Sequence, residues 1–304
     1  MRNIFTVQSD FVNTRLDRWF RKTICDVPQS LIEKNIRKGK IKVNQKKEKS
    51  SYKLKDKDKI VLHDINFNRS QYKKNKVKYS PTKSDLASTS SLFIENNENF
   101  AVINKPSGIS VQSGTKSKKN ILDILSKTNE FLNHKPYTVH RIDKETTGVL
   151  IVAKNRKFAQ LFTSLFRIRK IHKTYLGLVI GEFSKKKGTL KDQLYTYEGD
   201  KKITSEAITH YTVLDNNNNY SLLKLNPETG RKHQLRKQLL INNTPILGDT
   251  KYRISSNKNN KKGNLMLHAY KINFSINNIK YNFSAPLPEI FTKTLKEKYL
   301  KTFS

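Results

Sequence analysis

The chain contains very little cysteine and no long apolar run. Its 304 residues include one cysteine, Cys25, which excludes an intramolecular disulfide. Cys/His spacing typical of a metal site is also missing, which favours a reducing compartment and predicts neither metal nor cofactor. The N-terminal residues lack the apolar core of a signal peptide, and no apolar run approaches the roughly 20 residues of a membrane-spanning helix. We therefore expect a soluble cytoplasmic protein.

Acidic residues are scarce as well. Lysine and arginine number 60 against 25 aspartates and glutamates, which gives a formal net charge of +35. Such a surface attracts polyanions and is typical of nucleic-acid-binding proteins. Runs such as Asn216–Asn219 and Lys185–Lys187 indicate that a biased base composition of the gene contributes part of the excess. The low acid count still favours a nucleic acid as the partner.

Apolar patterning divides the chain into three stretches. Residues 1–65 combine helical and strand patterns in a small α+β module. Residues 66–90 are rich in Asn, Lys, Gln and Ser and cannot bury enough apolar surface to offset the entropy of ordering. This composition predicts a flexible basic linker. The alternative for its last few residues is a loop packed on the next domain. Residues 91–304 form a second, larger domain. We expect two folded domains joined by the linker.

The first stretch predicts two helices and a β ribbon. Apolar residues recur at helical spacing over 16–20 and again over 31–36, and Ser30 is the expected N-cap of the second helix. Gly39 ends that helix. Short strands follow at 41–43 and 60–62.

The third stretch predicts more strands than helices. The strands come in adjacent pairs, which favours an antiparallel or mixed α+β sheet over an alternating parallel fold. The expected strands span 100–103, 148–153, 174–180, 206–214 and 220–225. The expected helices span 120–132, 155–169 and 231–242. A polar, basic run at 255–262 predicts an exposed hairpin tip.

The most informative run is His140-Arg141-Ile142-Asp143, just before the clearest buried strand. A polar loop that delivers an acid to the edge of a core strand is a common position for a catalytic group. On composition alone, a solvated turn with a salt bridge is the more common interpretation of such a run. Other runs along the chain therefore decide how Asp143 is interpreted.

A second run, 226–240, contains Thr229-Gly230-Arg231. It predicts a helix with Arg231, Gln234 and Lys237 on one face and an N-terminus suited to an anion. A merely basic amphipathic helix is an equally good interpretation of this run alone. Two weaker runs are a turn at Asn104–Gly108 and a strand start at Lys173–Tyr175.

In this order, the runs resemble the RluA-type pseudouridine synthases. That family's pattern reads Asn-Lys-Pro-x-Gly, His-Arg-(Leu/Ile)-Asp-x-x-Thr-(Ser/Thr)-Gly, Lys-x-Tyr and Thr-Gly-Arg-x-His-Gln-(Ile/Leu)-Arg. Pro245–Tyr252 and Leu265–Ala269 are also similar to it, and the resemblance spans roughly 95–285. Ile142 stands where the family usually has Leu, Thr147 where it usually has Ser, and Lys232 where it usually has a small polar residue. These departures leave the acid and the arginine in place.

Residues 14–60 resemble an S4-type RNA-binding module, and Val111–Thr115 resembles the RluC-type subgroup. An S4 module before such a catalytic domain is typical of the ribosomal-RNA branch. The resemblance implies an S4-type α+β module followed by a catalytic domain with a mixed or antiparallel sheet. Asn44-Gln45 and Lys57-Asp58 stand where the module usually has Asn-Gly and Gly-Asp, so these two turns depart from its usual pattern.

The resemblance implies conversion of uridine to pseudouridine in RNA, in which N1–C1′ breaks and C5 joins C1′. Asp143 would be the catalytic acid residue, and attack on the sugar, attack on the base and removal of a sugar proton all remain open. Burial favours protonation of a carboxylate, so we expect the guanidinium of Arg231 to pair with Asp143. Tyr175 would stack on the flipped base, and Arg141 would fill the gap left in the RNA.

The remaining expectations concern support and affinity. We expect His140, His233 and His268 to brace loops through hydrogen bonds and not to exchange protons. Residues expected to bind RNA phosphates are Arg15, Arg18, Lys34, Arg37, Lys38, Lys40, Lys105 and Arg236. The expected partner is large-subunit ribosomal RNA, with transfer RNA as the alternative, and the protein is expected to be a monomer.

Two functions of other classes are also consistent with parts of the chain. A non-enzymatic RNA-binding or ribosome-assembly protein explains residues 1–65 and the charge, but not the loop acid and the distant arginine run. A metal-dependent nuclease needs several convergent acids or histidines. Asp143, Glu145 and the scattered Asp249 are thin support for such a site.

Overall fold

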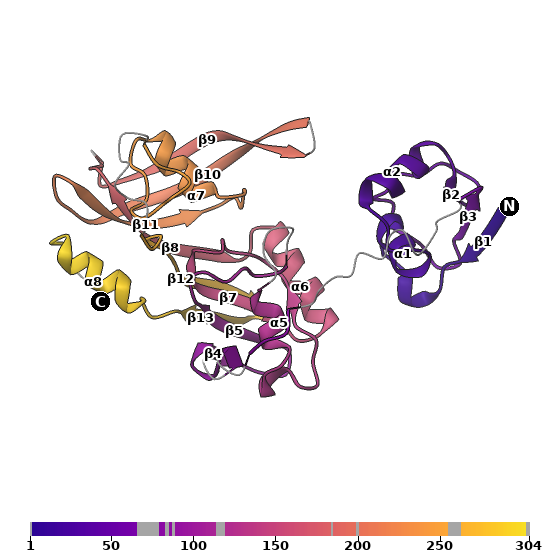
Figure 1. Cartoon of the computed structure of the whole chain (residues 1–304), viewed down its shortest axis with the longest axis horizontal. Helices are drawn as coiled ribbons and strands as arrows, with labels where there is room; N and C mark the ends of the chain where they lie inside the picture. Colours follow the sequence, from indigo (N-terminus) through magenta and orange to yellow (C-terminus); the bar gives the residue numbers. More distant parts are fainter. Residues whose placement is uncertain are drawn as a thin grey trace. The chain divides into compact units, whose positions relative to one another are not determined.

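The computed structural model describes residues 2–65, 79–82, 85–86, 89–113, 119–183, 185–198, 201–254 and 263–301. The chain divides into two compact units, Met1–Val77 and Lys78–Ser304, the first drawn in indigo in Figure 1. Residues 66–78, 83–84 and 87–88 of the expected linker and the whole expected hairpin tip at 255–262 lie outside the described residues.

In the described part of the first unit, an antiparallel sheet of order β1-β3-β2 accompanies two helices. The elements are β1 (Arg2–Thr6), α1 (Leu16–Thr23), α2 (Gln29–Arg37), β2 (Ile41–Val43) and β3 (Lys59–His63). Trp19 and Phe20 on α1 and Ile32 on α2 are at most 2% exposed. The two helices and the ribbon were predicted, whereas β1 was not.

The ends of α2 correct one prediction and confirm another. The helix begins at Gln29 after Pro28, whose fixed backbone angle suits a helix start, and no side chain caps it. Ser30 therefore lies in the first turn and is not the N-cap. The helix ends at Arg37, and Gly39 follows with a φ of +70°, as the sequence predicted.

The second unit is built on one mixed sheet, to which the described residues contribute ten strands. Its order is β4-β5-β7-β12-β8-β11-β10-β9, with β13 beside β12 and β6 beside β7. Only the pairing of β7 with β12 is parallel among the described strands. The predicted α+β fold with a mixed sheet is confirmed. The strands are β4 (Phe93–Asn96), β5 (Phe100–Lys105), β6 (Tyr137–Thr138), β7 (Thr147–Ala153), β8 (His172–Ile180), β9 (Lys187–Glu198), β10 (Lys201–Asn216), β11 (Tyr220–Pro227), β12 (Leu267–Ile276) and β13 (Ile279–Ser284).

Helices surround the strands of this sheet (Figure 1). They are α5 (Ile121–Leu125), α6 (Arg156–Arg167), α7 (Gln234–Ile241) and α8 (Glu289–Glu297), with short 3-10 turns at Ser90–Leu92 and Asn129–Phe131. Alternate residues of β7 point to opposite faces. Val149 and Ile151 therefore pack in one cluster with Phe162 of α6, and Leu150 packs in another with Ile124 of α5. A strand buried on both sides gives a rigid support to the loop before it.

The later part of the expected linker packs on the second unit. Tyr79, Leu86 and Leu92 are partly buried against the cluster that includes α5. The positions of Tyr79 and Leu86 thus favour the alternative in which the end of this stretch is a loop packed on the next domain. No helix among the described residues is long and apolar enough to cross a membrane.

Candidate active site

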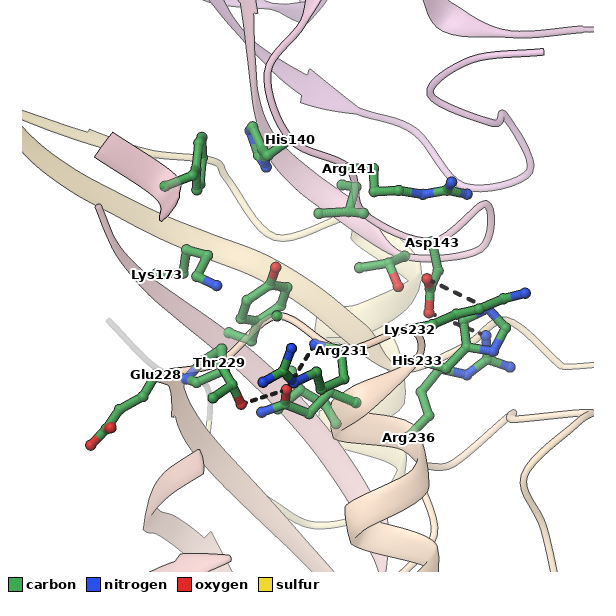
Figure 2. A pocket seen from close by; sticks show the side chains of 18 of the residues that line it. His140, Arg141, Asp143, Lys173, Glu228, Thr229, Arg231, Lys232, His233 and Arg236 are labelled. Atoms are coloured by element: carbon green, nitrogen blue, oxygen red, sulfur yellow. Dashed lines mark hydrogen bonds and ion pairs between the residues drawn. The ribbon is translucent and has the colours of Figure 1, made fainter. Parts of the chain in front are cut away.

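A cavity of about 700 Å³ opens beside the loop that carries Asp143. Its volume lies within the roughly 300–1,000 Å³ of small-ligand sites, so it has room for a nucleoside. Three segments line most of it: the loop before β7, the start of β8 and the turn between β11 and α7. Figure 2 shows Asp143 on one side of this pocket and Lys173 on the other. The runs that the sequence singled out around Asp143, Tyr175 and Arg231 thus meet in one place.

The loop of Asp143 is held from behind by the turn at Asn104–Gly108. The buried ammonium of Lys105 donates to the carbonyl oxygens of Pro106, Ile109 and Lys144 at 2.7–3.0 Å. The backbone N–H of Gly108 also donates to the Lys144 carbonyl, at 3.0 Å. A turn that was weak in the sequence thus fixes the residue after Asp143.

Lys105 was expected to bind RNA, and that prediction is wrong. Its side chain is 0% exposed, and its three donors are used by backbone carbonyls. Burial lowers the pKa of Lys105 to about 7, while the charges of Glu145 and Asp143 oppose that effect. Lys105 is therefore a clamp within the loop and is inaccessible to a phosphate.

Gly148, at the start of β7, lets the loop approach β12 closely. Its φ is +106°, and a Cβ there would lie 2.2 Å from the carbonyl oxygen of Ala269. Beside it, Thr147 Oγ1 and His268 Nδ1 are 2.8 Å apart. The Leu265–Ala269 run therefore serves the site by seating the base of the Asp143 loop.

The guanidinium beside Asp143 belongs to Arg236, on α7. Its Nη1 lies 3.4 Å from Asp143 Oδ2, and its Nε and Nη2 donate to the two oxygens of Asp249 at 2.7 Å each. Burial lowers the pKa of Arg236, but the hydrogen bonds and charges of Asp249 and Asp143 together raise it. Arg236 was expected among the phosphate-binding residues, but it is buried against these two carboxylates.

Arg231 does not pair with Asp143, so that prediction is corrected. Its Nε donates to the carbonyl oxygen of Glu206 at 2.9 Å, and the side chain is exposed at the pocket wall. The reason is local: Gln234 Oε1 accepts from the Arg231 N–H at 2.9 Å and from Thr229 Oγ1 at 2.7 Å. These bonds form a turn before α7, so Arg231 precedes the helix that was expected to carry it.

His233 stands at the N-cap of α7 in the left-handed region, with φ +54° and ψ +34°. Backbone of this kind is uncommon outside glycine and concentrates at functional sites. The ring lies 3.8 Å from Asp143 Oδ1 through Nε2, and Nδ1 is 2.8 Å from the hydroxyl of Tyr252. Burial lowers the pKa of His233, partly offset by the charge of Asp143. His233 and Arg236 thus flank the carboxylate, as Figure 2 shows.

Two residues of β8, Tyr175 and Lys173, also line the pocket, with Lys173 on the side away from Asp143 (Figure 2). Burial, with the charge of Asp143, raises the pKa of Tyr175, so the phenol is neutral near pH 7. Burial also lowers the pKa of Lys173. Thr146 also lines the pocket, and its Oγ1 is buried and has no hydrogen-bond partner among the described residues. A ligand in the pocket would therefore meet the aromatic ring of Tyr175 and the ammonium of Lys173.

The other two histidines are hydrogen-bonded braces, as the sequence predicted. His140 Nε2 accepts from the Ile151 N–H at 2.8 Å, and its ring stacks on Phe166 at 4.6 Å. Burial, with the charge of Lys173, lowers the pKa of His140 to about 3. Burial lowers the pKa of His268 to about 4, opposed by its contact with the Ala285 carbonyl. Both rings are neutral near pH 7.

The remaining predicted residues lie on exposed surfaces. Arg141 lines the pocket and is exposed. In the first unit, Arg18, Lys34, Arg37 and Lys38 are exposed. Two others are engaged locally: Arg15 forms a bidentate pair with Asp17, and Lys40 Nζ donates to the carbonyl oxygen of Asp64 at 3.2 Å.

Sequence reasoning missed the roles of Asp249, Tyr252 and Lys173. Asp249 and Tyr252 stand in the Pro245–Tyr252 run, and Lys173 opens the Lys-x-Tyr run, but the pattern alone assigned none of them a function in the site. Of the Val111–Thr115 stretch, residues 114–115 lie outside the described residues. The site thus places the Asp143 carboxylate against a guanidinium and an imidazole, in a pocket of nucleoside size that Tyr175 also lines.

Comparisons with known proteins identify the family of the chain. The family described as RNA pseudouridylate synthase matches residues 99–240. Ribosomal large subunit pseudouridine synthase C of Buchnera aphidicola subsp. Baizongia pistaciae is 35% identical over 301 residues, covering 93% of each chain. The protein of that name from Rickettsia conorii is 34% identical, covering 93% of this chain and 97% of its own length.

A solved structure has a similar fold over most of the chain. Human RNA Pseudouridylate Synthase Domain Containing 4 matches with a TM-score of 0.63 and 26% identity, over 72% of this chain and 98% of that one. Fold and site together define an isomerase that acts on RNA. The chain belongs to the RNA pseudouridine synthase family.

Proposed function

We propose that the chain converts uridines of large-subunit ribosomal RNA to pseudouridine, with Asp143 as the catalytic carboxylate. The support for the substrate is the function named for relatives that match nearly the whole chain. The support for Asp143 is its placement: it is the pocket acid that lies against Arg236 and His233 while its side chain stays 22% exposed to the cavity. Transfer RNA is the alternative substrate.

In this proposal, each wall of the pocket has one task. Arg236 and His233 fix the orientation of the Asp143 carboxylate at 3.4 and 3.8 Å. Tyr175 offers an aromatic face to a uracil that has left the RNA stack. The carboxylate can then attack the sugar or the ring, or remove a sugar proton, while the N1–C1′ bond breaks and C5 joins C1′. Isomerisation needs no external group.

We also propose that the first unit is an S4-type RNA-binding module that adds affinity without reading sequence. The exposed cations Arg18, Lys34, Arg37 and Lys38 support this role. Because its substrate is ribosomal RNA, we place the protein in the cytoplasm, and we propose that it acts as a monomer.

Pseudouridine mapping tests the proposal directly. Ribosomal and transfer RNA from cells with the protein, without it, and with only Asp143→Asn are compared. We expect large-subunit uridines to lose modification in the last two, and Asp143→Asn to slow single-turnover reaction at least roughly 10³-fold while RNA still binds. Loss confined to transfer RNA would reassign the substrate.

The two other classes of function make different predictions in the same experiment. A pure ribosome-assembly protein would retain its function in Asp143→Asn cells, and no modification would depend on the carboxylate. A nuclease would cleave RNA and lose activity with a chelator. Among the described residues, no three His, Cys, Asp or Glu side chains gather in a way that could hold a metal ion.

A further inference from the structure

Two tyrosines project from the edge of the second unit's sheet. Tyr195 and Tyr197 on β9 are 52% and 66% exposed, far more than a core aromatic. They are two residues apart on one strand and therefore share a face. Their ring centroids lie 6.0 Å apart at an interplanar angle of 80°. The catalytic pocket does not include either ring.

Cations surround Tyr195. Lys202, opposite Tyr197 on β10, places its ammonium 4.7 Å from the Tyr195 ring centre, and Lys237 lies 5.7 Å from the same centre. Lys237 Nζ also donates to the Tyr195 carbonyl oxygen at 2.8 Å. Burial lowers the pKa of Lys237, and the positive charges of Lys232 and Lys251 lower it further. These two exposed lysines therefore lie close enough to Lys237 to act on its charge. Two carboxylates among the described residues of these strands are already engaged: Glu206 by Lys191, and Asp192 by Gln238.

This surface is tied to the catalytic pocket through α7. Lys237 follows Arg236, whose guanidinium lies beside Asp143, and Lys232 itself lines the pocket. An RNA strand whose target base enters the pocket would therefore have neighbouring nucleotides within reach of Lys232, Lys237 and Tyr195. Exposed aromatic faces among cations are the features with which proteins bind single-stranded nucleic acid.

We propose that Tyr195 and Tyr197 form a stacking platform for an unpaired base of the substrate RNA outside the catalytic pocket, with Lys202 and Lys232 binding adjacent phosphates. The proposal rests on the proposed function, because it takes RNA as the substrate. Because any base can stack on an aromatic ring, the platform adds affinity for RNA that is single-stranded beside the target uridine. It does not discriminate between base sequences.

Binding measurements on the full chain test the platform. The probes are a short single-stranded oligouridylate and an RNA duplex of the same length. We expect the double variant Tyr195→Ala/Tyr197→Ala to bind the oligouridylate roughly tenfold or more weakly and to bind the duplex unchanged. Tyr195→Phe/Tyr197→Phe keeps both rings and should bind like the natural protein. Tyr299→Ala is the matched control, because Tyr299 is 91% exposed and belongs to neither the platform nor the pocket.

Two further readouts separate stacking from other roles. The alanine pair should leave the salt dependence of oligouridylate binding unchanged, whereas Lys202→Ala should reduce its slope by about 0.7. The proposal is overturned if the alanine and phenylalanine pairs bind alike, or if the natural protein self-associates in sedimentation through these tyrosines while RNA affinity stays constant. Failure of the proposed function would show instead as a pseudouridine pattern in ribosomal RNA that is the same with and without the protein, whatever the oligouridylate result.

Discussion

Arg236 and Asp249 form a bidentate ion pair whose carboxylate is fully buried, and this pair aims the remaining Nη1 of Arg236 at Asp143. The two acids therefore have different roles around one guanidinium. Asp249 also accepts from the backbone N–H groups of Lys251 and Tyr252, at 2.9 Å each, and has no face toward solvent. Asp143 keeps 22% of its side chain exposed in the pocket and is free to react.

Removing Arg236 should cost both stability and activity. Arg236→Met leaves the buried charge of Asp249 without its partner, and losses of this kind are about 3–5 kcal/mol in the free energy of unfolding. Urea denaturation measures this, and a single-turnover assay at saturating RNA measures the accompanying fall in rate. Arg231→Met is the matched control, with a stability change within about 0.5 kcal/mol, because Arg231 is exposed. Equal destabilisation by the two variants would contradict the assignment.

Acid should weaken the fold through His140. Burial lowers its pKa from 6.5 to about 3 in the folded chain, so between these values the unfolded chain binds more protons. The contribution of neutral His140 to the free energy of unfolding is therefore fully present above pH 6.5. It falls as the pH drops toward 3, by at most about 1.4 kcal/mol per pH unit. His140→Gln retains an acceptor for the Ile151 N–H but does not titrate. Urea denaturation from pH 7 to 4 should show a shallower loss for this variant. The remaining loss comes from other groups whose pKa is lowered in the folded chain, among them His268 and His233, and parallel curves would refute the prediction.

Arg141 should matter more to RNA engagement than to the chemical step. Its side chain is exposed at the pocket mouth, and no described contact links it to Asp143. Arg141→Ala should raise the Kd for substrate RNA roughly tenfold, which is about the loss expected when one stacking contact is removed. It should reduce the single-turnover rate at saturating RNA much less. Arg141→Lys keeps the charge but loses the planar group, so it should recover only part of the affinity. Equal losses of rate and affinity would argue against a role in filling the stack.

The first unit should give RNA binding a measurable salt dependence. Arg37→Ala removes an exposed cation of α2, and the slope of log K against log salt should decrease by about 0.7–0.9 for each phosphate that is no longer neutralised. Arg15→Gln provides the contrast, since Asp17 already engages that guanidinium at 2.6 and 3.1 Å. Titrations over a range of salt concentrations compare the two slopes. A slope identical to that of the natural protein in Arg37→Ala would remove Arg37 from the RNA-binding surface.

Local patterns predicted much of the fold. The strand at Thr147–Ala153 was evident because it is apolar on both faces, and α6 because its apolar residues repeat at helical spacing. The edge strand β9 was missed because Leu190 and Leu194 are its only strongly buried apolar side chains among charged and polar neighbours. The α8 helix was likewise not expected, since its few buried residues, Phe291 and Leu295 among them, are separated by polar ones.

The sequence by itself determined the class of protein, the mixed α+β sheet and Asp143 as the residue to test. Each of these can be inferred from short runs of residues and from their order along the chain. Only the tertiary structure decided which arginine stands beside that acid. Asp143 and Arg236 are 93 residues apart, and their contact depends on a left-handed His233 and on the turn that Gln234 holds. Only the structure also decided the role of Lys105. In the sequence, a lysine in a polar turn cannot be distinguished from a residue that binds RNA, whereas in the structure three carbonyl oxygens surround its ammonium. Such contacts join residues distant in sequence, and no local spacing encodes them.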